Sequence, residues 1–277
     1  PASVQTINGI AFGAMPALTA ITVDSGNLNY AAQDGVLYTK DIKTLVQYPN
    51  GKSGTTFTVP AGVETIEQGA FQENPGLTGV TLPAGLLHLK TRAFSGASKL
   101  QTIAIPASVQ EVGGQALARC PALTAITVET GNPNYAAQDG VLYTKDIKTL
   151  VQYPNGKSGA TFTVPNGVET IGPSAFYSST LTGVTLPEGM LAIESQAFQS
   201  AGLTAASFPA SLTSFTSGCF YGCLDLEEIT FHNPGKWMMD NPFYACPKLF
   251  TVWGYPGSTA EDYAKRYNYL FKSLEEA

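Results

Sequence analysis

An internal repeat constrains this chain more than any other feature. The 26 residues from Asn29 to Gly54 recur letter for letter at 134–159, an offset of 105 residues, and Pro16–Val23 recurs at the same offset. A shorter period of 22 or 23 residues lies inside the long one. It is marked by recurring prolines: Pro60, Pro83, Pro106, Pro165, Pro187 and Pro209. A fixed period of this length is typical of solenoids, in which each repeat forms one turn of a stack.

Alignment on this period gives eight turns, the last of them degenerate. Two of the turns are followed by an insertion of 36 residues, at about 24–58 and 129–163. Each turn ends in a short alternating segment such as Val80-Thr81-Leu82, which predicts a strand with one buried face, and Pro83 then ends the strand. An aligned aromatic position predicts a continuous internal stack, in which only Leu117 departs from phenylalanine. The predicted members are Phe12, Phe71, Phe94, Phe176, Phe198, Phe220 and Phe243.

No single turn is expected to be stable alone. The apolar area that one turn buries within itself is too small to offset the conformational entropy of ordering it. Neighbouring turns must cover both of its sides, so stability is shared along the stack.

The repeat resembles the BspA-type leucine-rich repeats. The resemblance lies in the Ala-Phe pair, a cysteine three residues after the phenylalanine in some turns, the L-x-x-I-T-L-P ending, the GVLYTKDIKTLVQYPNGK insertion and the C-terminal GYPGSTAEDYAKRYNYLFKSL. It implies an α/β-type solenoid with a right-handed superhelix, a parallel concave sheet, two β-hairpin insertions and a short C-terminal capping helix. One domain is expected over 1–277, with the cap at about 254–277. The resemblance also implies an exported bacterial protein, located at the cell surface or outside the cell.

The C-terminal cap has its own local signal. Ser258 and Glu261 form a capping-box pattern, which predicts a short helix to about Asn268. We expect Ala264 and Tyr267 to face the last turn, and the Leu270-Phe271 step to close the core. No comparable cap precedes Pro1, so further native sequence is expected upstream.

Composition excludes several classes of protein. With 14 Phe and 13 Tyr, and only 13% charged residues, the chain does not have the composition of a disordered protein. A net charge of −6 without a basic stripe excludes a nucleic-acid partner. No apolar run reaches the roughly 18 residues of a membrane helix, so no membrane insertion is expected.

The sequence offers no chemistry for catalysis. It has two His residues far apart, His88 and His232, and no nucleophile elbow or metalloprotease helix. We therefore expect no catalytic residue, no metal site and no cofactor, and the protein is not expected to be an enzyme. Cys120, Cys223 and Cys246 occupy the same repeat position, and we expect each of them to be a small buried side chain. A bridge between Cys223 and Cys246, in successive turns, is the alternative.

The insertions offer the first candidate contact residues. Residues 36–48 predict a β-hairpin with a four-residue loop, entered by the turn at Asp34-Gly35. Repeat insertions often map to a binding face, and tyrosine gives contact area at low entropic cost. The alternative is that these tyrosines seal the flank of the solenoid. The candidates are Tyr38, Tyr48, Tyr143 and Tyr153.

The outward positions of the parallel sheet offer the second set of candidate contact residues. Two rows of mostly threonine are expected, and the candidate contact residues on them are Thr81, Thr127, Thr185 and Trp253. Threonine suits an exposed strand by propensity alone, so a purely structural role is the alternative to an uncharged binding groove. The aromatic end of this face, Trp237, Phe250 and Trp253, is the best single place for a contact.

These features favour a non-enzymatic module that binds a protein, either of a host or of another cell surface, and mediates adhesion. Two alternatives stay open. One is a carbohydrate-binding surface that uses Tyr and Trp as stacking platforms. The other is a structural spacer that holds an upstream domain away from the cell.

Overall fold

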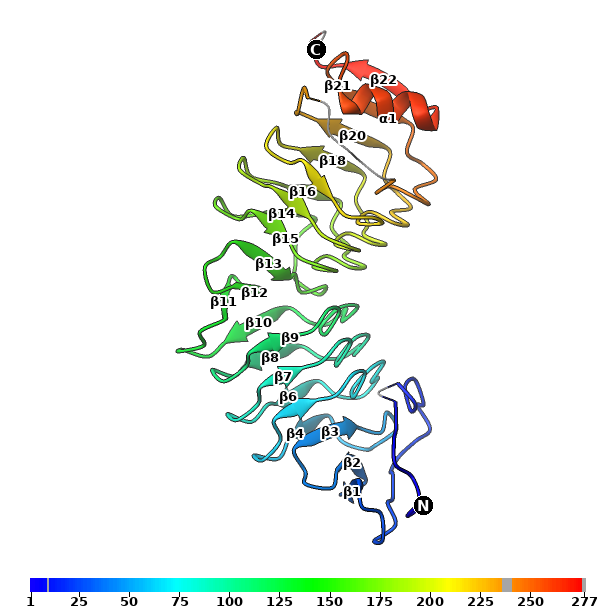
Figure 1. Cartoon of the computed structure of the whole chain (residues 1–277), viewed down its shortest axis with the longest axis vertical. Coiled ribbons are helices and arrows are strands. Elements are labelled where there is room, and N and C mark those ends of the chain that lie inside the picture. Colours follow the sequence, from blue (N-terminus) through cyan, green and yellow to red (C-terminus); the bar gives the residue numbers. More distant parts are fainter. Residues whose placement is uncertain (9, 236–240, 276–277) are drawn as a thin grey trace. The chain divides into compact units, whose positions relative to one another are not determined.

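The computed structural model describes residues 1–8, 10–235 and 241–275. The chain divides into two compact units, each a stack of parallel turns (Figure 1). Unit 1 comprises residues 1–145 with 154–157, and unit 2 comprises 146–153 with 158–277. Trp237 lies outside the described residues. The hand of the superhelix and the single-domain organisation stay predictions.

Unit 1 contains one sheet built from the strand at the end of each turn. Its order is β10-β8-β6-β4, and all pairs are parallel. In β8, Thr102 and Ala104 are exposed whereas Ile103 and Ile105 are buried, as the alternating sequence predicts. The bounds of the strands are β4 Thr56–Thr58, β6 Gly79–Thr81, β8 Thr102–Ile105 and β10 Ala125–Val128.

A second sheet of unit 1 runs along the return path of the turns. Strands β1, β2 and β3 pair antiparallel, and β3, β5, β7 and β9 pair parallel. The bounds are β1 Tyr30–Gln33, β2 Val36–Thr39, β3 Thr44–Gln47, β5 Thr65–Ile66, β7 His88–Leu89 and β9 Glu111–Val112. The second insertion gives unit 1 another antiparallel pair, β11 (Tyr135–Gln138) with β12 (Val141–Thr144).

Each insertion therefore contains more than a hairpin. In the first, β3 and β4 stack on β5 and β6 in parallel register, and the ring of Tyr48 stacks on Phe71 at 5.3 Å. Strands β1 and β2 are added at the outer edge of this extra turn. The expected number of eight turns was too low, because the insertions carry turns of their own and the chain has about 10.

Unit 2 repeats the two-sheet arrangement. On one side β14 pairs with β16, and β18, β20, β21 and β22 form a parallel sheet. The return path carries β13, β15, β17 and β19, also parallel. The bounds are β13 Thr149–Gln152, β14 Thr161–Thr163, β15 Thr170–Ile171, β16 Gly183–Thr185, β17 Ala192–Ile193, β18 Ala205–Phe208, β19 Ser214–Phe215, β20 Glu228–Phe231, β21 Thr251–Gly254 and β22 Leu270–Ser273.

The predicted aromatic stack is confirmed inside each unit. Phe71 and Phe94 stack at 4.7 Å in unit 1, and the buried side chain of Leu117 follows them. In unit 2, rings stack at 4.7 to 5.1 Å from turn to turn, and the series ends against Tyr263 of the cap. Its members are Tyr153, Phe176, Phe198, Phe220, Phe243 and Tyr263. The tyrosines Tyr48 and Tyr153 thus occupy the phenylalanine position of the inserted turns. Phe12 in the first turn is only half-buried.

The cysteines donate to backbone carbonyls and are not joined by disulfide bonds. All four are buried free thiols. The thiols of Cys120, Cys223 and Cys246 each donate to the carbonyl oxygen of the aromatic residue one turn earlier, at 3.1 to 3.2 Å. Burial raises the pKa of the Cys120 thiol to about 12. The small buried role expected for this position is therefore the one observed.

The C-terminal cap consists of α1 (Thr259–Tyr267) beside β22 (Figure 1). Ser258 is the N-cap residue, but its hydroxyl donates to the carbonyl of Tyr255, and the carboxylate of Glu261 accepts from the backbone N–H of Gly257. Ala264 is buried as expected, together with Tyr263. Leu270 is 54% exposed, so the expectation that it closes the core was wrong, because alternation along β22 turns it outward.

Identical sequence does not give identical structure in the first turn. Residues 20–23 and 125–128 have the same letters, but only the second set forms a strand, β10, which pairs with β8. Ile21 is half-buried, whereas Ile126 is completely buried. The strand therefore depends on a neighbouring turn, as expected for a stack whose units stabilise one another.

Candidate contact surfaces

The tyrosines of the insertions lie in the interior. Tyr38, Tyr48 and Tyr143 are each 1% exposed and Tyr153 is 2% exposed. Burial, with a smaller effect from the neighbouring carboxylates Asp34 and Asp139, raises the pKa of Tyr38 and Tyr143 to about 12. These side chains seal the flank and fill the stack. They have no exposed area to offer a partner, and this corrects the expectation that they form a contact face.

The threonine row along the strands is exposed. Thr58 pairs with Thr81 and Ala104 pairs with Thr127 in unit 1, and Thr163 pairs with Thr185 in unit 2. Sequence reasoning missed Thr58 and Thr163, because both lie in the insertions. The segment T-F-T-V-P at 56–60 carried the signal, since it matches G-V-T-L-P at 79–83.

The adjacent threonine row has a structural explanation. The hydroxyl groups of Thr78, Thr124, Thr182 and Thr204 each donate to a backbone carbonyl of the preceding turn, at 3.0 to 3.3 Å. Each bond ties one turn to the next, so these threonines are accounted for without a ligand.

Trp253 is held by its neighbours on the outward face of the β18-β20-β21-β22 sheet. Its indole N–H donates to the carboxylate of Glu228 at 3.2 Å, and the ammonium of Lys272 lies 4.7 Å from the ring centroid. The ring is half-buried. Phe250, one residue before β21, is 56% exposed, and Leu270 on β22 is 54% exposed. We call these four residues, Phe250, Trp253, Leu270 and Lys272, the Trp253 surface.

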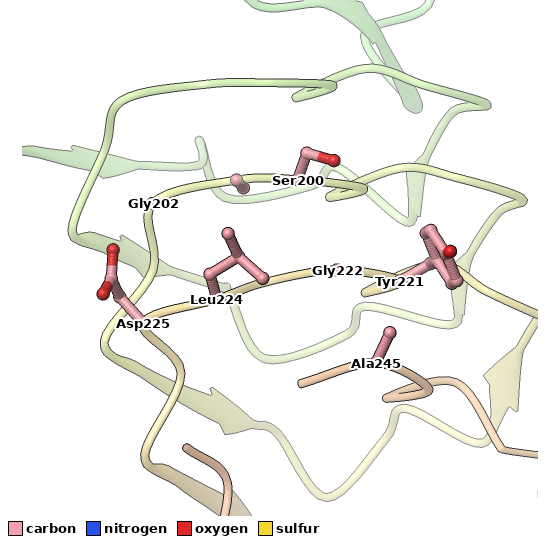
Figure 2. A pocket seen from close by; sticks show the side chains of 8 residues that line it. Ser200, Gly202, Tyr221, Gly222, Leu224, Asp225 and Ala245 are labelled. Carbon is pink, nitrogen blue, oxygen red and sulfur yellow. The ribbon is translucent and has the colours of Figure 1, made fainter. Parts of the chain in front are cut away.

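A groove lies in unit 2, and sequence reasoning missed it. Its volume is about 350 Å³, and Figure 2 shows Tyr221 at one end, Asp225 at the other and Leu224 between them. Tyr221 is 40% exposed and Leu224 is 62% exposed. The rings of Tyr221 and Tyr244 stack at 5.7 Å with 25° between their planes. We call this hollow the Tyr221 groove.

Small residues in left-handed backbone form part of the Tyr221 groove. Ser200, Gly222 and Ala245 each stand two residues after the stacked phenylalanine of their turn, with φ of 55°, 69° and 60°. At the far end, the carboxylate of Asp225 accepts from the ammonium of Lys248 at 2.7 Å. This hydrogen bond, with a smaller effect from Glu227, raises the pKa of Lys248. The small size of these three residues was only a weak signal in the sequence, because turns ordinarily carry small residues.

The two histidines of the sequence each contact a neighbouring side chain. The imidazole of His88 pairs with Glu111 at 3.2 Å, and that of His232 contacts the hydroxyl of Ser207 at 3.1 Å. Among the described residues, no group of three or more His, Cys, Asp or Glu side chains is arranged to hold a metal ion. No helix in the described ranges has the length and apolar character needed to cross a bilayer.

Comparison with known families identifies the repeat. The BspA type leucine-rich repeat region matches residues 47–155 and 153–261, in six copies. The chain belongs to the BspA-type leucine-rich repeat family. Solenoids of this family are generally non-enzymatic, and leucine-rich repeat folds commonly mediate protein interactions. None of the curated proteins matches the sequence.

Two solved structures share the fold. A leucine-rich repeat protein of Eubacterium ventriosum is 24% identical, with a TM-score of 0.58 over 73% of this chain and 69% of that one. A leucine rich cell surface protein of Faecalibacterium prausnitzii is 29% identical, with a TM-score of 0.54 over 76% of this chain. The match spans 62% of the length of that second protein.

Proposed function

We propose that this chain is a non-enzymatic protein-binding and adhesion module of an exported bacterial surface protein. The observation that carries the proposal is where large apolar side chains are exposed. Of nine such side chains among the described residues, five lie between residues 221 and 270, on the last turns of unit 2: Tyr221, Leu224, Tyr244, Phe250 and Leu270. Exposed aromatic and aliphatic groups gathered on one region are typical of protein contact sites.

The Trp253 surface supplies the anchor of this proposed contact. Trp and Tyr residues dominate the binding energy of many interfaces, and Trp253 is already positioned by Glu228 and Lys272. In unit 2 the exposed Thr185 adds to the proposed contact residues. In unit 1 the exposed Thr81 and Thr127 form a separate candidate row. The cell-surface description of the Faecalibacterium prausnitzii protein supports the same location, extracellular or on the cell surface.

One observation favours each alternative. The stacked and exposed pair Tyr221 and Tyr244 favours a carbohydrate ligand, because sugar rings stack on aromatic faces. The burial of Tyr38, Tyr48 and Tyr143 favours a spacer role for unit 1. The partner-binding proposal accommodates the second observation, because its main contact residues lie in unit 2.

The test is the binding of the fluorescently labelled full chain to intact host or bacterial cells. The cells are used untreated, after protease shaving and after glycosidase treatment. Protein recognition predicts that binding is lost after protease and kept after glycosidase. Loss after glycosidase alone supports the carbohydrate alternative, and no saturable binding to any cell supports the spacer.

Variants locate the contact within the chain. Replacing Phe250 and Leu270 with Thr removes exposed apolar area from the Trp253 surface without emptying the core. The matched control replaces Leu28, which is 83% exposed in unit 1, with Thr. The proposal expects at least a tenfold loss of affinity for the first variant and none for the control. Equal affinities for both variants contradict this location.

A further inference from the structure

The repeat position whose small residues leave the Tyr221 groove open in unit 2 carries large charged side chains in unit 1. The residues two after the stacked position of three successive turns are Glu73, Gly96 and Arg119, with φ of 54°, 75° and 56°. The carboxylate of Glu73 extends over the middle turn, where it accepts from the guanidinium of Arg119 at 2.8 Å. A Cβ on Gly96 would lie 2.5 Å from the carboxyl carbon of Glu73, so this carboxylate lies directly over the glycine.

Unit 2 has the same backbone without these side chains. Ser200, Gly222 and Ala245 replace Glu73, Gly96 and Arg119, and the hydrogen bonds between turns are equivalent. The N–H of Glu73 donates to Ser95 just as that of Ser200 donates to Tyr221. A Cβ on Gly222 would lie 3.6 Å from the Ser200 hydroxyl, which is ordinary contact. The space that an ion pair fills in unit 1 is therefore left open in unit 2.

We propose that the Tyr221 groove binds an arginine side chain of the protein partner. The proposal rests on the protein-binding function above and names a recognition element for it. Unit 1 provides the physical example, because there the guanidinium of Arg119 pairs with a carboxylate that lies over the middle glycine. The incoming group takes the place of Arg119, and its counter-charge comes from the Asp225 end of the groove.

The side chains that flank the groove suit a guanidinium. The face of an exposed tyrosine attracts a planar cation, and Tyr221, which lines the groove and stacks on Tyr244, supplies such a ring. The carboxylate of Asp225 accepts charge-assisted hydrogen bonds, and the Ser200 hydroxyl supplies a further acceptor. Asp225 already pairs with Lys248, but both side chains are more than half exposed, and such pairs are weak and exchange readily.

The charge of the chain supports a basic partner group. The sequence of unit 2 contains 6 Lys+Arg and 12 Asp+Glu residues, whereas that of unit 1 contains 9 of each. The whole net charge of −6 is therefore carried by the unit that contains the groove. A field of this sign attracts a cationic side chain and disfavours an acidic one.

The test is a titration of the isotope-labelled full chain with Ac-Gly-Arg-Gly-NH₂, followed by backbone NMR shifts. A single side chain in an open groove is expected to bind with Kd on the order of millimolar. Shifts are expected at residues 200–202, 221–225 and 245. The matched probe, Ac-Gly-Gln-Gly-NH₂, has no charge and should leave these signals unchanged.

Two variants make the outcome decisive. Ser200→Glu with Ala245→Arg rebuilds the unit 1 ion pair over Gly222, on backbone that already has the same conformation. It should abolish the peptide-induced shifts, and a separate thermal melt checks that the fold is kept. Asp225→Asn should weaken peptide binding at least fivefold, and the effect should decrease as salt increases.

The inference fails if the arginine and glutamine peptides give the same shifts, or if the filled variant still responds. That result leaves the proposed function standing wherever the full chain still binds protease-sensitive sites on cells. If cell binding is absent but the arginine peptide shifts residues 221–225, the groove stands and the adhesion role falls.

Discussion

Units 1 and 2 use the same turn for different purposes. In unit 1 a polar pair, Glu73 and Arg119, spans the Gly96 turn, and beyond residue 28 none of the described side chains is a large exposed hydrophobe. In unit 2 the equivalent positions are small, aromatic rings stand beside them, and the unit carries the net negative charge. The backbone is held constant by stacking and hydrogen bonds between turns. We therefore propose that function in such a chain depends on which repeat positions carry large side chains and which carry small ones.

The largest expected effect is on stability and tests the aromatic stack, which both units share. Phe94→Ala in unit 1 and Phe198→Ala in unit 2 each remove a ring that is 1% exposed and stacked on its neighbours. Each should lower the free energy of unfolding by about 3–5 kcal/mol. Denaturant unfolding followed by circular dichroism measures it, with the exposed Leu191→Ala as control. An unaffected unit would show that its aromatic stack does not stabilise it.

A smaller effect concerns the buried tyrosines of unit 1. Their pKa of about 12 exceeds the ordinary value of 10, so the folded state favours the protonated phenol. This stabilisation is complete below pH 10 and is lost as the pH rises from 10 to about 12. The double variant Tyr38→Phe with Tyr143→Phe should therefore lose less stability between pH 10 and 12 than the parent chain. Melting temperatures measured across this range check it, and identical losses would contradict the burial of these phenols.

The ion pair over Gly96 should contribute little to stability. Its side chains are 33% and 48% exposed, and pairs of this kind contribute about 0–1 kcal/mol. Glu73→Gln should change the free energy of unfolding by no more than that, and the change should shrink as salt increases. A loss above about 2 kcal/mol would mean that the pair holds unit 1 together, and the comparison with the open groove would lose its basis.

The smallest expected effect tests whether an open groove is sufficient to bind the arginine peptide. Glu73→Ser with Arg119→Ala empties the unit 1 position, but Ser95 and Ala118 stand where unit 2 has Tyr221 and Tyr244. Lys99 also stands where unit 2 has Asp225. This variant should not respond to the arginine peptide at residues 73–99. A response there would show that any vacant turn binds the peptide and that the flanking residues of unit 2 are unnecessary.

Much of the fold was predictable because periodicity is a strong signal. The turn length, the strand ending at Pro83 and the aromatic stack all follow from one aligned column of residues. The extra turns were missed because Tyr48 and Tyr153 replace phenylalanine in that column, so the insertions read as hairpins rather than as turns. Their place in repeat insertions, which often map to a binding face, suggested exposure, but position in the stack decides burial.

The groove was not predictable in the same way. Ser200, Gly222 and Ala245 are ordinary turn residues in the sequence, and an open space is defined by the side chains that are absent from it. Only the equivalent positions in unit 1, where Glu73 and Arg119 meet, show that the space can hold a charged group. Leu270 shows the same limit at the cap, since an apolar residue near the end of the core turned out to be exposed.

The most direct test of the contrast between the units exchanges their side chains in one binding measurement. Affinity for protease-sensitive sites on cells is compared for the parent chain, Ser200→Glu with Ala245→Arg, and Glu73→Ser with Arg119→Ala. We predict at least a tenfold loss when the unit 2 groove is filled and no change when the unit 1 position is emptied, with both variants folded. Undiminished binding by the filled variant, or a loss confined to the unit 1 variant, would contradict the assignment of partner recognition to the Tyr221 groove.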